Sequence, residues 1–337
     1  MWRNCDIIPQ LKDGKDPALT ASHRPISLSS CPGKLLEKII ADRMTYILED
    51  RQLLTQNQAG FRPGRCTTDQ ILKLTQSATD QMQRRNLPKD ETHATIIAFF
   101  DYEKAYDKVW RHGLLYKMQE LGLPRKFIRY ARSFLSGRIT TVNVNNTRSH
   151  SILLKEGLLQ GSSISPLLFL IFINDIDVDI RDDSLASLFA DDTSVWRNGG
   201  VLKGETRDLM QQEVDAVLRW AHTWKMSVNT DKTKTMIISS NPSESKYNPE
   251  LKAGNDPVIN TSTYKFLGPT IDDGMRFTEQ VEKLILKCKK RNKILKSMAW
   301  KEWGSKLESL RTLYIQYTGT CMEYASSSWA PWIAPAA

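Results

Sequence analysis

The sequence predicts an α+β protein, and three features carry that prediction. Two strand-forming runs flank Asp191 and Asp192, which is the pattern of a β-hairpin with a tight turn. Residues 95–100 are almost entirely apolar, as expected of a strand that is buried on both faces inside a sheet. Residues 35–48 and 205–226 repeat apolar side chains at helical spacing. We therefore expect a sheet containing hairpins, against which amphipathic helices pack.

Composition indicates an ordinary globular chain that is basic. With 337 residues, of which 40% are hydrophobic and 25% charged, the chain is long enough for two domains or for one large domain with subdomains. The net charge of +9 suits a polyanionic partner, although an ordinary basic protein is the alternative. No apolar run approaches the roughly 18 residues of a membrane span, and the first residues form no signal core. We expect no membrane partner and a location inside the cell, in the nucleus or the cytoplasm.

The cysteines predict neither disulfides nor a zinc site. Five cysteines are scattered along the chain without a C-x-x-C pair, and none of the five histidines lies near a cysteine at zinc-binding spacing. Reduced thiols in an intracellular compartment are therefore expected.

The first quarter of the chain predicts a loop, two helices and a basic turn. Proline and glycine punctuate residues 1–22, which predicts a loop. After the helix over 35–48, residues 60–65 (G-F-R-P-G-R) predict a tight turn before a helix that begins near Asp69. Two arginines between glycines suit phosphate contact, because the backbone can approach closely and guanidinium groups grip the oxygens; a solvated turn is the alternative. Residues 84–91 predict a polar loop.

Asp101 directly follows the strand over 95–100, so we expect another group to compensate its negative charge. A carboxylate at the end of a buried strand costs free energy unless another group compensates it. We expect a helix to follow at once, with Tyr106 in its first turns.

A second hairpin and an apolar helix are predicted in the middle of the chain. Residues 139–144 and 151–154 form two β-prone runs across a pair of asparagines. Residues 156–166 are rich in glycine and serine and predict a turn that opens an apolar helix over 167–175.

The last third of the chain predicts short strands and then helices. A strand is expected at 236–238, a loop or linker over 241–257, and a short hairpin within 264–271. Helical patterns cover 277–300 and 306–317, and the first of them is the most cationic part of the chain. Such a face is either a solvated helix surface or a contact for a nucleic-acid backbone. Its basic residues are Lys283, Lys287, Lys289, Lys290, Arg291, Lys293 and Lys296.

The adjacent aspartates are the strongest chemical feature of the sequence. Of the three Asp-Asp pairs, only Asp191-Asp192 lies between two apolar β-runs. Successive side chains of a strand point to opposite faces, but at a turn both carboxylates can stand near one cation. A plain hairpin turn is the alternative. Together with Asp101, these carboxylates can hold two magnesium ions, which also take phosphate oxygens and water as ligands.

Seven short stretches match the motifs of one family, in residue type and in order along the chain. The chain resembles the reverse transcriptase domain of non-LTR (LINE-type) retrotransposons, and the seven stretches span nearly the whole chain. They are H-R-P-I-S-L-S-S at 23–30, Q-A-G-F-R-P-G-R at 58–65, F-F-D-Y-E-K-A-Y-D-K-V at 99–109, Q-G-S-S-I-S-P-L-L-F at 160–169, F-A-D-D at 189–192, N-T-D-K-T-K at 229–234 and Y-K-F-L-G at 264–268.

The resemblance implies an architecture and an activity. The fold would be a right-hand polymerase with fingers at 1–92 (incomplete at the N-terminus), a palm with an antiparallel sheet at 93–272 and a helical thumb at 273–337. An insertion at 111–155 could add to the fingers. The activity would be RNA-directed DNA polymerisation, extending a DNA 3′ end on an RNA template by two-metal nucleotidyl transfer. The partners would be RNA template, DNA primer and deoxynucleoside triphosphates, and the cofactor two Mg²⁺ ions, with Mn²⁺ as an alternative.

The resemblance also implies roles for individual residues. Asp101, Asp191 and Asp192 would be the metal-binding catalytic carboxylates, the first two as direct ligands of both ions. Lys232 would protonate the departing pyrophosphate, with Lys234 as a rival. The remaining residues would contact substrates: Tyr106 as a steric gate against a 2′-hydroxyl, Gln160 and Gly161 in the nucleotide pocket, Arg62 at the triphosphate, and Lys283, Lys287, Lys290 and Arg291 on the template–primer backbone.

The chain also departs from the family in ways that bear on activity. Leu159 stands where the family has proline before the Gln-Gly-Ser turn, which loosens the turn but removes no chemical group. The length leaves no room for the endonuclease and the nucleic-acid-binding domains that flank this domain in full-length elements, so an isolated domain, a truncated element copy or the product of a partial gene is expected. A catalytically inactive nucleic-acid-binding relic is therefore the alternative function. An RNA-directed RNA polymerase is disfavoured by Tyr106.

Overall fold

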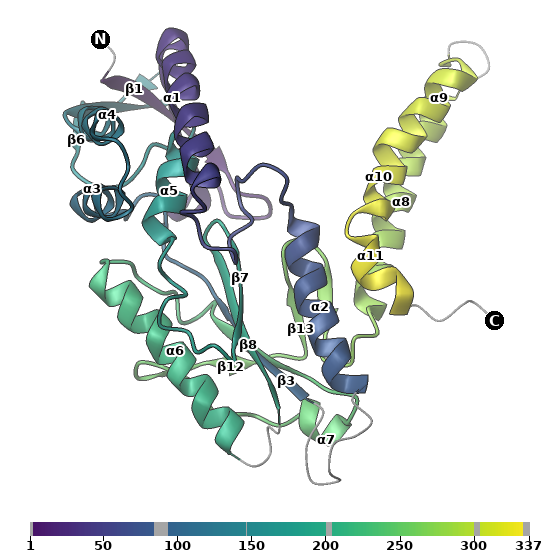
Figure 1. Cartoon of the computed structure of the whole chain (residues 1–337). Coiled ribbons are helices and arrows are strands. Elements are labelled where there is room, and N and C mark those ends of the chain that lie inside the picture. Colours follow the sequence, from purple (N-terminus) through teal and green to yellow (C-terminus); the bar gives the residue numbers. More distant parts are fainter. Residues whose placement is uncertain (1–2, 84–93, 146, 200–203, 300–303, 333–337) are drawn as a thin grey trace.

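Two sheets and a separate group of helices organise the chain. In this computed structural model the described residues are 3–83, 94–145, 147–199, 204–299 and 304–332. A central sheet lies in the middle, an N-terminal sheet with three helices lies at one end of it, and the C-terminal helices stand to one side (Figure 1). Among the described residues, no helix combines the length and apolar character that crossing a membrane demands.

The central sheet places the carboxyl end of its middle strand beside the Asp-Asp hairpin. Its strands, in spatial order, are β12 (Ile259–Asn260), β9 (Lys234–Ile238), β3 (Ala94–Phe100), β8 (Asp192–Gly199) and β7 (Leu185–Phe189). The middle strand β3 runs antiparallel to β8 and to β9, as predicted for this sheet. Its last residue, Phe100, pairs with Thr193, so Asp101 follows directly beside the start of β8.

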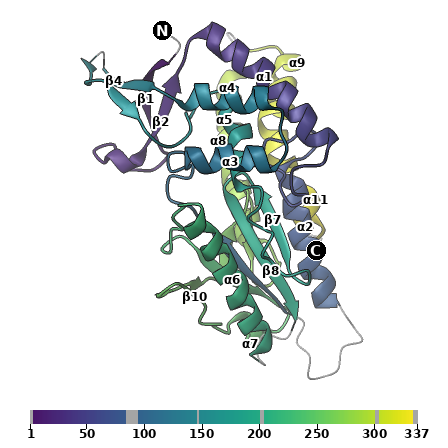
Figure 2. The same ribbon diagram turned by 60° about the vertical axis from the view of Figure 1, so that its left-hand side comes forward.

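Helices cover both faces of this sheet, which explains why β3 is apolar throughout. Every residue of β3 is buried. Ile96 and Ala98 belong to the core that includes α6 (Glu205–Thr223), whereas Ile97 and Phe99 belong to the core that includes α2 (Thr67–Gln83). The two helices flank the sheet in both views (Figure 1 and Figure 2). The predicted helices over 205–226 and from Asp69 are therefore confirmed.

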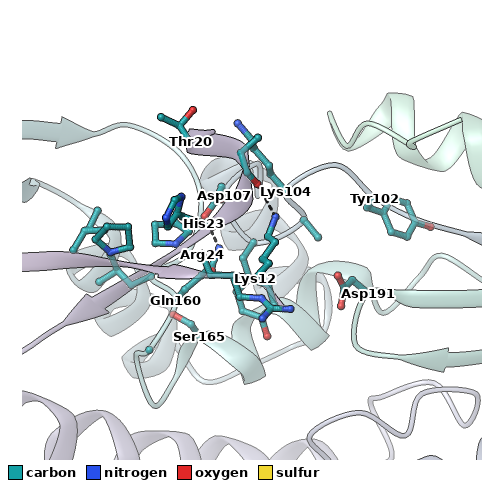
Figure 3. Close-up of a pocket in the computed structure, with 18 of the residues that line it drawn as sticks. Lys12, Thr20, His23, Arg24, Tyr102, Lys104, Asp107, Gln160, Ser165 and Asp191 are labelled. Carbon is teal, nitrogen blue, oxygen red and sulfur yellow. Dashed lines mark hydrogen bonds between the residues drawn. The ribbon is translucent and has the colours of Figure 1, made fainter. Parts of the chain in front are cut away.

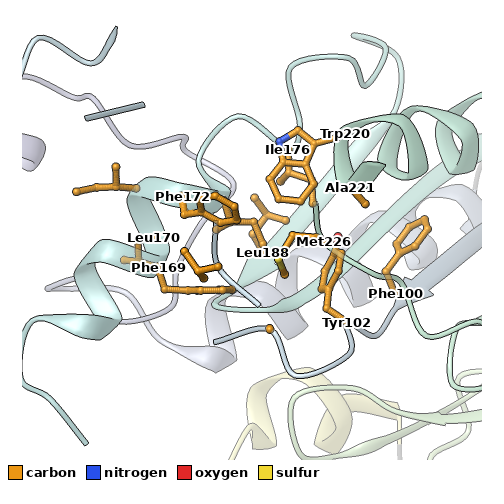
Figure 4. Close-up of a cluster of buried hydrophobic side chains, with 14 of the residues drawn as sticks. Phe100, Tyr102, Phe169, Leu170, Phe172, Ile176, Leu188, Trp220, Ala221 and Met226 are labelled. Carbon is orange, nitrogen blue, oxygen red and sulfur yellow. The ribbon is translucent and has the colours of Figure 1, made fainter. Parts of the chain in front are cut away.

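The larger core gathers around α5 (Ser165–Ile173). Eight of the nine residues of this helix are buried, and its residues are apolar on all sides, as expected of a helix surrounded by protein. Phe169 and Phe172 lie among Leu188, Trp220 and Met226 (Figure 4). This packing fixes α5, and with it the Gln-Gly-Ser turn that precedes the helix, against the central sheet.

The N-terminal sheet corrects the prediction of a loop over 1–22. Its strands are β1 (Asn4–Leu11), β2 (His23–Leu28), β4 (Arg138–Val144), β5 (Thr147–Arg148) and β6 (Ile152–Leu154), with a 3₁₀ turn η1 (Thr20–Ser22) before β2. Strand β1 was predicted as a loop because it contains Pro9. Only Asn4–Ile7 pair with β4, so the missing N–H of Pro9 leaves no group of β4 unpaired. The predicted hairpin of 139–144 with 151–154 is confirmed.

Three helices accompany this sheet: α1 (Cys31–Asp50), α3 (Arg111–Glu120) and α4 (Arg125–Leu135). The helix expected directly after Asp101 begins only at Arg111, and turns occupy the intervening residues, so Tyr106 is not helical. The reason lies in the carbonyls of this segment. Those of Tyr106 and Val109 accept hydrogen bonds from Leu158 N (2.7 Å) and Gly157 N (3.0 Å), which ties the segment to the Gln-Gly-Ser turn.

The C-terminal third begins with short elements and ends in helices. The short elements are α7 (Pro242–Ser245), β10 (Lys252–Ala253), β11 (Asp256–Pro257), β13 (Thr263–Lys265) and β14 (Thr270–Asp272). The predicted hairpin within 264–271 is confirmed. The long helix α8 (Thr278–Met298) packs against a second helical stretch. That stretch comprises α9 (Leu307–Leu313), a π-helical turn η2 (Tyr314–Gly319), α10 (Thr320–Glu323), α11 (Ser326–Trp329) and η3 (Ala330–Trp332).

Both predicted C-terminal helices are therefore confirmed, and the second is longer and less regular than expected. Every residue of α8 is described and none is buried, which suits a helix that stands away from the core. The predicted polar loop over 84–91 lies outside the described residues. The limits set for fingers, palm and thumb remain a prediction.

Candidate active site

A cavity of about 1160 Å³ lies where the N-terminal sheet meets the central sheet (Figure 3). Its wall is formed by chain segments that are far apart in the sequence. Six of the residues predicted to form the site line it together: Asp101, Tyr106, Gln160, Gly161, Asp191 and Lys232. The fold therefore converts separate sequence stretches into one concave site.

The hairpin turn separates the roles of the two adjacent aspartates. Phe189 pairs with Asp192, so Ala190 and Asp191 are the two residues of the turn and Asp192 is the first residue of β8. Asp191 lines the cavity, whereas Asp192 is not among the described lining residues. Ala190 has a φ of +55°, a left-handed conformation that costs an L-residue roughly 1–2 kcal/mol.

The three carboxylates act on one another electrostatically. Desolvation is the main cause that raises the pKa of Asp191, and the negative charge of Asp101 raises it further. Although Asp192 is exposed at the start of β8, partial desolvation raises its pKa to about 6, and the charges of Asp191 and then Asp101 add to that rise. The ionised forms of Asp191 and Asp192 are thus less stable than they would be in water, and a bound cation would offset this repulsion.

Among the described residues, Lys232 forms an ion pair with one of these carboxylates. Its Nζ lies 3.4 Å from Asp101 Oδ1, and the backbone of the same segment is anchored because Asn229 N donates to Asp101 O at 2.7 Å. Lys234, the rival general acid, instead donates to the carbonyl of Asp231 at 2.6 Å and is not among the described cavity residues. The geometry therefore favours Lys232 over Lys234.

The donor set fits magnesium, although no complete metal cage exists in the described part of the chain. Within those residues, no three histidine, cysteine, aspartate or glutamate side chains are grouped closely enough to hold a metal by themselves. Magnesium is commonly bound through only one or two carboxylates together with phosphate oxygens and water. Asp101 and Asp191 both line the cavity and supply two such carboxylates.

Tyr106 combines a core contact with a position at the cavity. Its ring stacks on Phe169, with centroids 4.7 Å apart and planes 10° from parallel. Burial, and then the charge of Asp191, raise the pKa of the Tyr106 hydroxyl. The ring is held rigidly while one side of it reaches the cavity.

The Gln-Gly-Ser turn is fixed from both sides. Gln160 O accepts from Ser27 N at 2.6 Å, and Gln160 Nε2 donates to Asp107 Oδ1 at 3.0 Å. Gly161 has a φ of +106°, and a Cβ there would lie 2.8 Å from Ser27 O, so only glycine fits. The buried Glu37 accepts hydrogen bonds from the serines that follow, so the turn is held firmly with Leu159 in place.

Sequence reasoning missed a group of cations on the cavity wall. Lys12, Arg24 and Lys104 line the cavity, the first two from β1 and β2 or the loop between them (Figure 3). Burial raises the pKa of Asp107, and the positive charges of Lys104 and Lys12 offset part of that rise. Residues 12–24 carry three basic and two acidic side chains, so the sequence gave no indication that Lys12 and Arg24 line the same cavity as the aspartates.

Arg62 lies in an ion pair with Glu49 and is not among the described residues of the cavity. Its side chain is 2% exposed, and its guanidinium forms a two-pronged ion pair with Glu49, with N···O distances of 2.8 and 2.7 Å. A third nitrogen donates to the carbonyls of Thr55 and Gln58. Arg62 is therefore not among the described residues that line the cavity, whereas its neighbour Phe61 is.

The basic residues predicted to bind nucleic acid lie on α8, outside the cavity. Lys283 pairs with Glu279 at 2.6 Å, and Arg291 stacks on the ring of Tyr317 at 4.4 Å. Lys287 and Lys290 are exposed. All four belong to one helix, which stands to one side of the central sheet, beyond α2 and β13 (Figure 1).

Tyr264 is a further aromatic residue near the aspartates that sequence reasoning did not single out. Its ring stacks on Phe99 with centroids 3.9 Å apart. Burial, and then the charges of Asp192 and Asp101, raise its pKa to about 12. Its presence in the Y-K-F-L-G stretch was the only signal.

Comparison with known families agrees with this arrangement. The family described as reverse transcriptase (RNA-dependent DNA polymerase) matches residues 11–271, which is more than half of the chain. The chain belongs to the reverse transcriptase family, whose members act on nucleic acids and generally use a divalent metal.

The matching relatives are retrotransposon proteins, which confirms the resemblance found in the sequence. The RNA-directed DNA polymerase from mobile element jockey of Drosophila melanogaster is 28% identical over 287 residues, covering 83% of this chain and 30% of that protein. The probable RNA-directed DNA polymerase from transposon BS, of the same species, is 27% identical over 335 residues, covering 97% of this chain and 36% of that protein. The chain thus spans about a third of the length of these relatives.

Solved structures confirm the fold class. Telomerase from Candida tropicalis in complex with a TWJ fragment of telomeric RNA matches with a TM-score of 0.59 and 12% identity, covering 98% of this chain and 54% of that one. Apo telomerase from the same organism gives a TM-score of 0.55 at 12% identity, over 99% of this chain and 60% of that one. The fold is an α+β right-hand polymerase.

Proposed function

We propose that this chain is an RNA-directed DNA polymerase that extends a DNA 3′ end on an RNA template. The observation that carries the proposal is the shared cavity, which six predicted site residues from four distant chain segments line together. Membership of the reverse transcriptase family and the retrotransposon relatives support it.

The aspartates at the cavity serve as the metal-binding groups in this proposal. Asp101 and Asp191 bind two Mg²⁺ ions, for which Mn²⁺ can substitute, and Asp192 adds negative charge from the start of β8. When bound, such ions activate the attacking 3′-hydroxyl and neutralise charge on the departing pyrophosphate. Lys232 donates a proton to that pyrophosphate, a role that its place at the cavity beside Asp101 supports.

The other cavity residues select and hold the nucleotide. Gln160 and Gly161 contact the incoming deoxynucleoside triphosphate, and the fixed ring of Tyr106 excludes a 2′-hydroxyl. The cationic wall of Lys12, Arg24 and Lys104 takes the place first predicted for Arg62 and binds the triphosphate.

The remaining parts of the proposal concern the template and primer. The basic residues of α8 contact the phosphate backbone of the template–primer without reading its sequence. In this description residues 1–92 with part of 111–155 are fingers, 93–272 palm and 273–337 thumb. Such a polymerase, which consumes cellular nucleotides, works in the nucleus or the cytoplasm.

Primer extension with two matched variants tests the proposal. Purified chain, Asp191→Asn and Asp182→Asn are given a DNA primer on an RNA template with magnesium. Both variants remove one negative charge, but Asp182 is exposed and is not among the described cavity residues. Extension by the wild type and Asp182→Asn only is expected, with template–primer binding nearly equal in all three.

The other outcomes separate the alternatives. Equal extension by Asp191→Asn rejects the metal assignment. Salt-sensitive binding to the template–primer without extension by any of the three favours the catalytically inactive relic.

A further inference from the structure

The Q-A-G-F-R stretch at 58–62 has a place in the structure that nucleotide binding does not explain. It lies against β7, the edge strand of the central sheet. Ala59 N donates to Leu188 O at 2.9 Å, and Leu188 N donates to Asn57 O at 3.0 Å. Gln58 and Leu188 form an isolated parallel bridge. The segment therefore extends the central sheet beyond β7, at the end of the strand that leads into the Asp191 turn.

The side chain of Gln58 grips the turn itself. It is 1% exposed, and its Oε1 accepts from Ala190 N at 2.9 Å and from Gly60 N at 2.8 Å. The Nε2 of the same Gln58 amide donates to Ala190 O at 3.4 Å. One amide thus holds both backbone polar groups of the residue that precedes Asp191.

The backbone conformation of Ala190 is one that needs hydrogen bonds from its surroundings to be stable. Its φ of +55° lies in the region that glycine, asparagine and aspartate adopt most readily at hairpin turns, and alanine brings no polar side chain of its own. A strained residue of this kind persists only where its surroundings determine its conformation. Gly60 fits closely against it, because a Cβ on Gly60 would lie 2.3 Å from Ala190 N.

Arg62 fixes the loop from which Gln58 acts. Its guanidinium joins Glu49 on α1 to the carbonyls of Thr55 (2.7 Å) and Gln58 (3.1 Å). The contacts thus run without a break from α1 through Arg62 and Gln58 to the turn. This gives the buried arginine a function that does not require it to reach a phosphate.

We propose that Gln58 is a positioning residue for polymerisation: it fixes the backbone of Ala190 and thereby the place of the Asp191 carboxylate at the cavity. The inference rests on the proposed function, since it assigns Gln58 a role in the site where Asp191 binds a divalent cation. Its loss weakens cation binding and lowers kcat, while KM for the deoxynucleotide changes little because Gln58 is not among the described cavity residues.

The experiment compares Gln58→Met with Gln70→Met. Methionine matches glutamine in size but cannot make these hydrogen bonds. Gln70 on α2 is also buried, at 5% exposure, and its Oε1 finds no hydrogen-bond partner among the described residues. The two variants therefore remove the same chemical group from the interior, and only one of them touches the turn.

Binding of Mn²⁺, followed by the electron paramagnetic resonance of the free ion, is measured without nucleic acid. Gln58→Met is expected to bind Mn²⁺ about 10-fold more weakly than the wild type, the usual size of an effect on residues that orient metal ligands. In primer extension it is expected to need correspondingly more Mg²⁺ for half-maximal rate and to lose kcat. Gln70→Met is expected to match the wild type in both measurements.

Equal Mn²⁺ affinity in Gln58→Met and the wild type, at equal thermal stability, overturns the inference. If Gln58→Met does not fold, Gln58→Asn decides, because it keeps the amide but withdraws it by one methylene, and unchanged Mn²⁺ affinity there also overturns the inference. A wild type that binds Mn²⁺ but extends no primer contradicts the proposed function alone, and weakened Mn²⁺ binding by Gln58→Met would still support the inference. A wild type that binds no Mn²⁺ overturns the inference, whereas primer extension by that wild type still decides the proposed function.

Discussion

Lys232 Nζ lies 3.4 Å from Asp101 Oδ1, although 131 positions separate the two residues in the chain. The contact arises because the segment that precedes β9 is hydrogen-bonded to the backbone of Asp101 through Asn229. It places an ammonium group beside Asp101, and it distinguishes Lys232 from Lys234, whose Nζ donates to the carbonyl of Asp231.

Lys232→Arg is expected to lower kcat in primer extension by about 100-fold or more, the range in which general acid catalysis acts. Arginine keeps the positive charge beside Asp101 but gives up its proton far less readily than lysine does. Binding of template–primer should therefore stay near the wild-type value. Single-turnover nucleotide incorporation measures the effect.

Lys234→Arg is the matched control, because its Nζ donates to a backbone carbonyl and not to a cavity carboxylate. It should reduce the rate only slightly. A larger loss in Lys234→Arg than in Lys232→Arg would reverse the assignment of the general acid.

Asp192→Asn is expected to raise the unfolding temperature at pH 7.5 in the absence of divalent cations. Desolvation and the charges of Asp191 and Asp101 raise the pKa of Asp192 to about 6, so the folded state holds this proton more tightly than the unfolded state. The stability that the protonated carboxyl contributes is complete below the unfolded pKa of about 3.9 and is lost as the pH rises through about 6. Asparagine cannot ionise, so the gain should be greatest above pH 7 and vanish near pH 4.

Thermal unfolding monitored from pH 4 to 8 with a chelator present measures this difference. The exposed Asp182 supplies the control, since Asp182→Asn should leave the unfolding temperature nearly unchanged at every pH. A gain in Asp192→Asn of the same size at pH 4 and pH 7.5 would show that repulsion among the carboxylates is not its cause.

Local sequence signals predicted most of the secondary structure, because hairpins and amphipathic helices are encoded over short windows. They failed where distant partners decide the conformation. β1 was missed because Pro9 suggested a loop, and only pairing with β2 and β4 makes it a strand. The helix expected directly after Asp101 begins only at Arg111, because Gly157 and Leu158 donate hydrogen bonds to carbonyls of the preceding segment.

In the candidate site, too, local patterns could be predicted from the sequence, whereas features that depend on distant residues could not. The residues that carry a distinctive chemical pattern, such as Asp101 and Asp191, could be found from the sequence. Arg62 could not be placed, because an arginine on a glycine-flanked loop suits a phosphate or a buried carboxylate equally well, and the choice depends on Glu49. The cations Lys12 and Arg24 were missed because their role follows from the way β1 and β2 fold over the central sheet.

Tyr106→Ala is expected to raise the use of ribonucleotides relative to deoxyribonucleotides. The ring is stacked on Phe169 with planes 10° from parallel, so it cannot move aside to admit a 2′-hydroxyl without breaking that contact. Removal of the ring opens space at the cavity, whereas removal of the hydroxyl alone does not. Tyr106→Phe should therefore keep the wild-type preference.

The measured quantity is the ratio of kcat/KM for the two nucleotides, each incorporated opposite the same template base. A ratio is insensitive to the fraction of enzyme that is folded, which matters because an aromatic residue partly in the core is being shortened. A flat ratio in Tyr106→Ala would leave this ring with only its packing role on Phe169. An altered ratio in Tyr106→Phe would move the discrimination from the ring to its hydroxyl, whose pKa burial and Asp191 already raise.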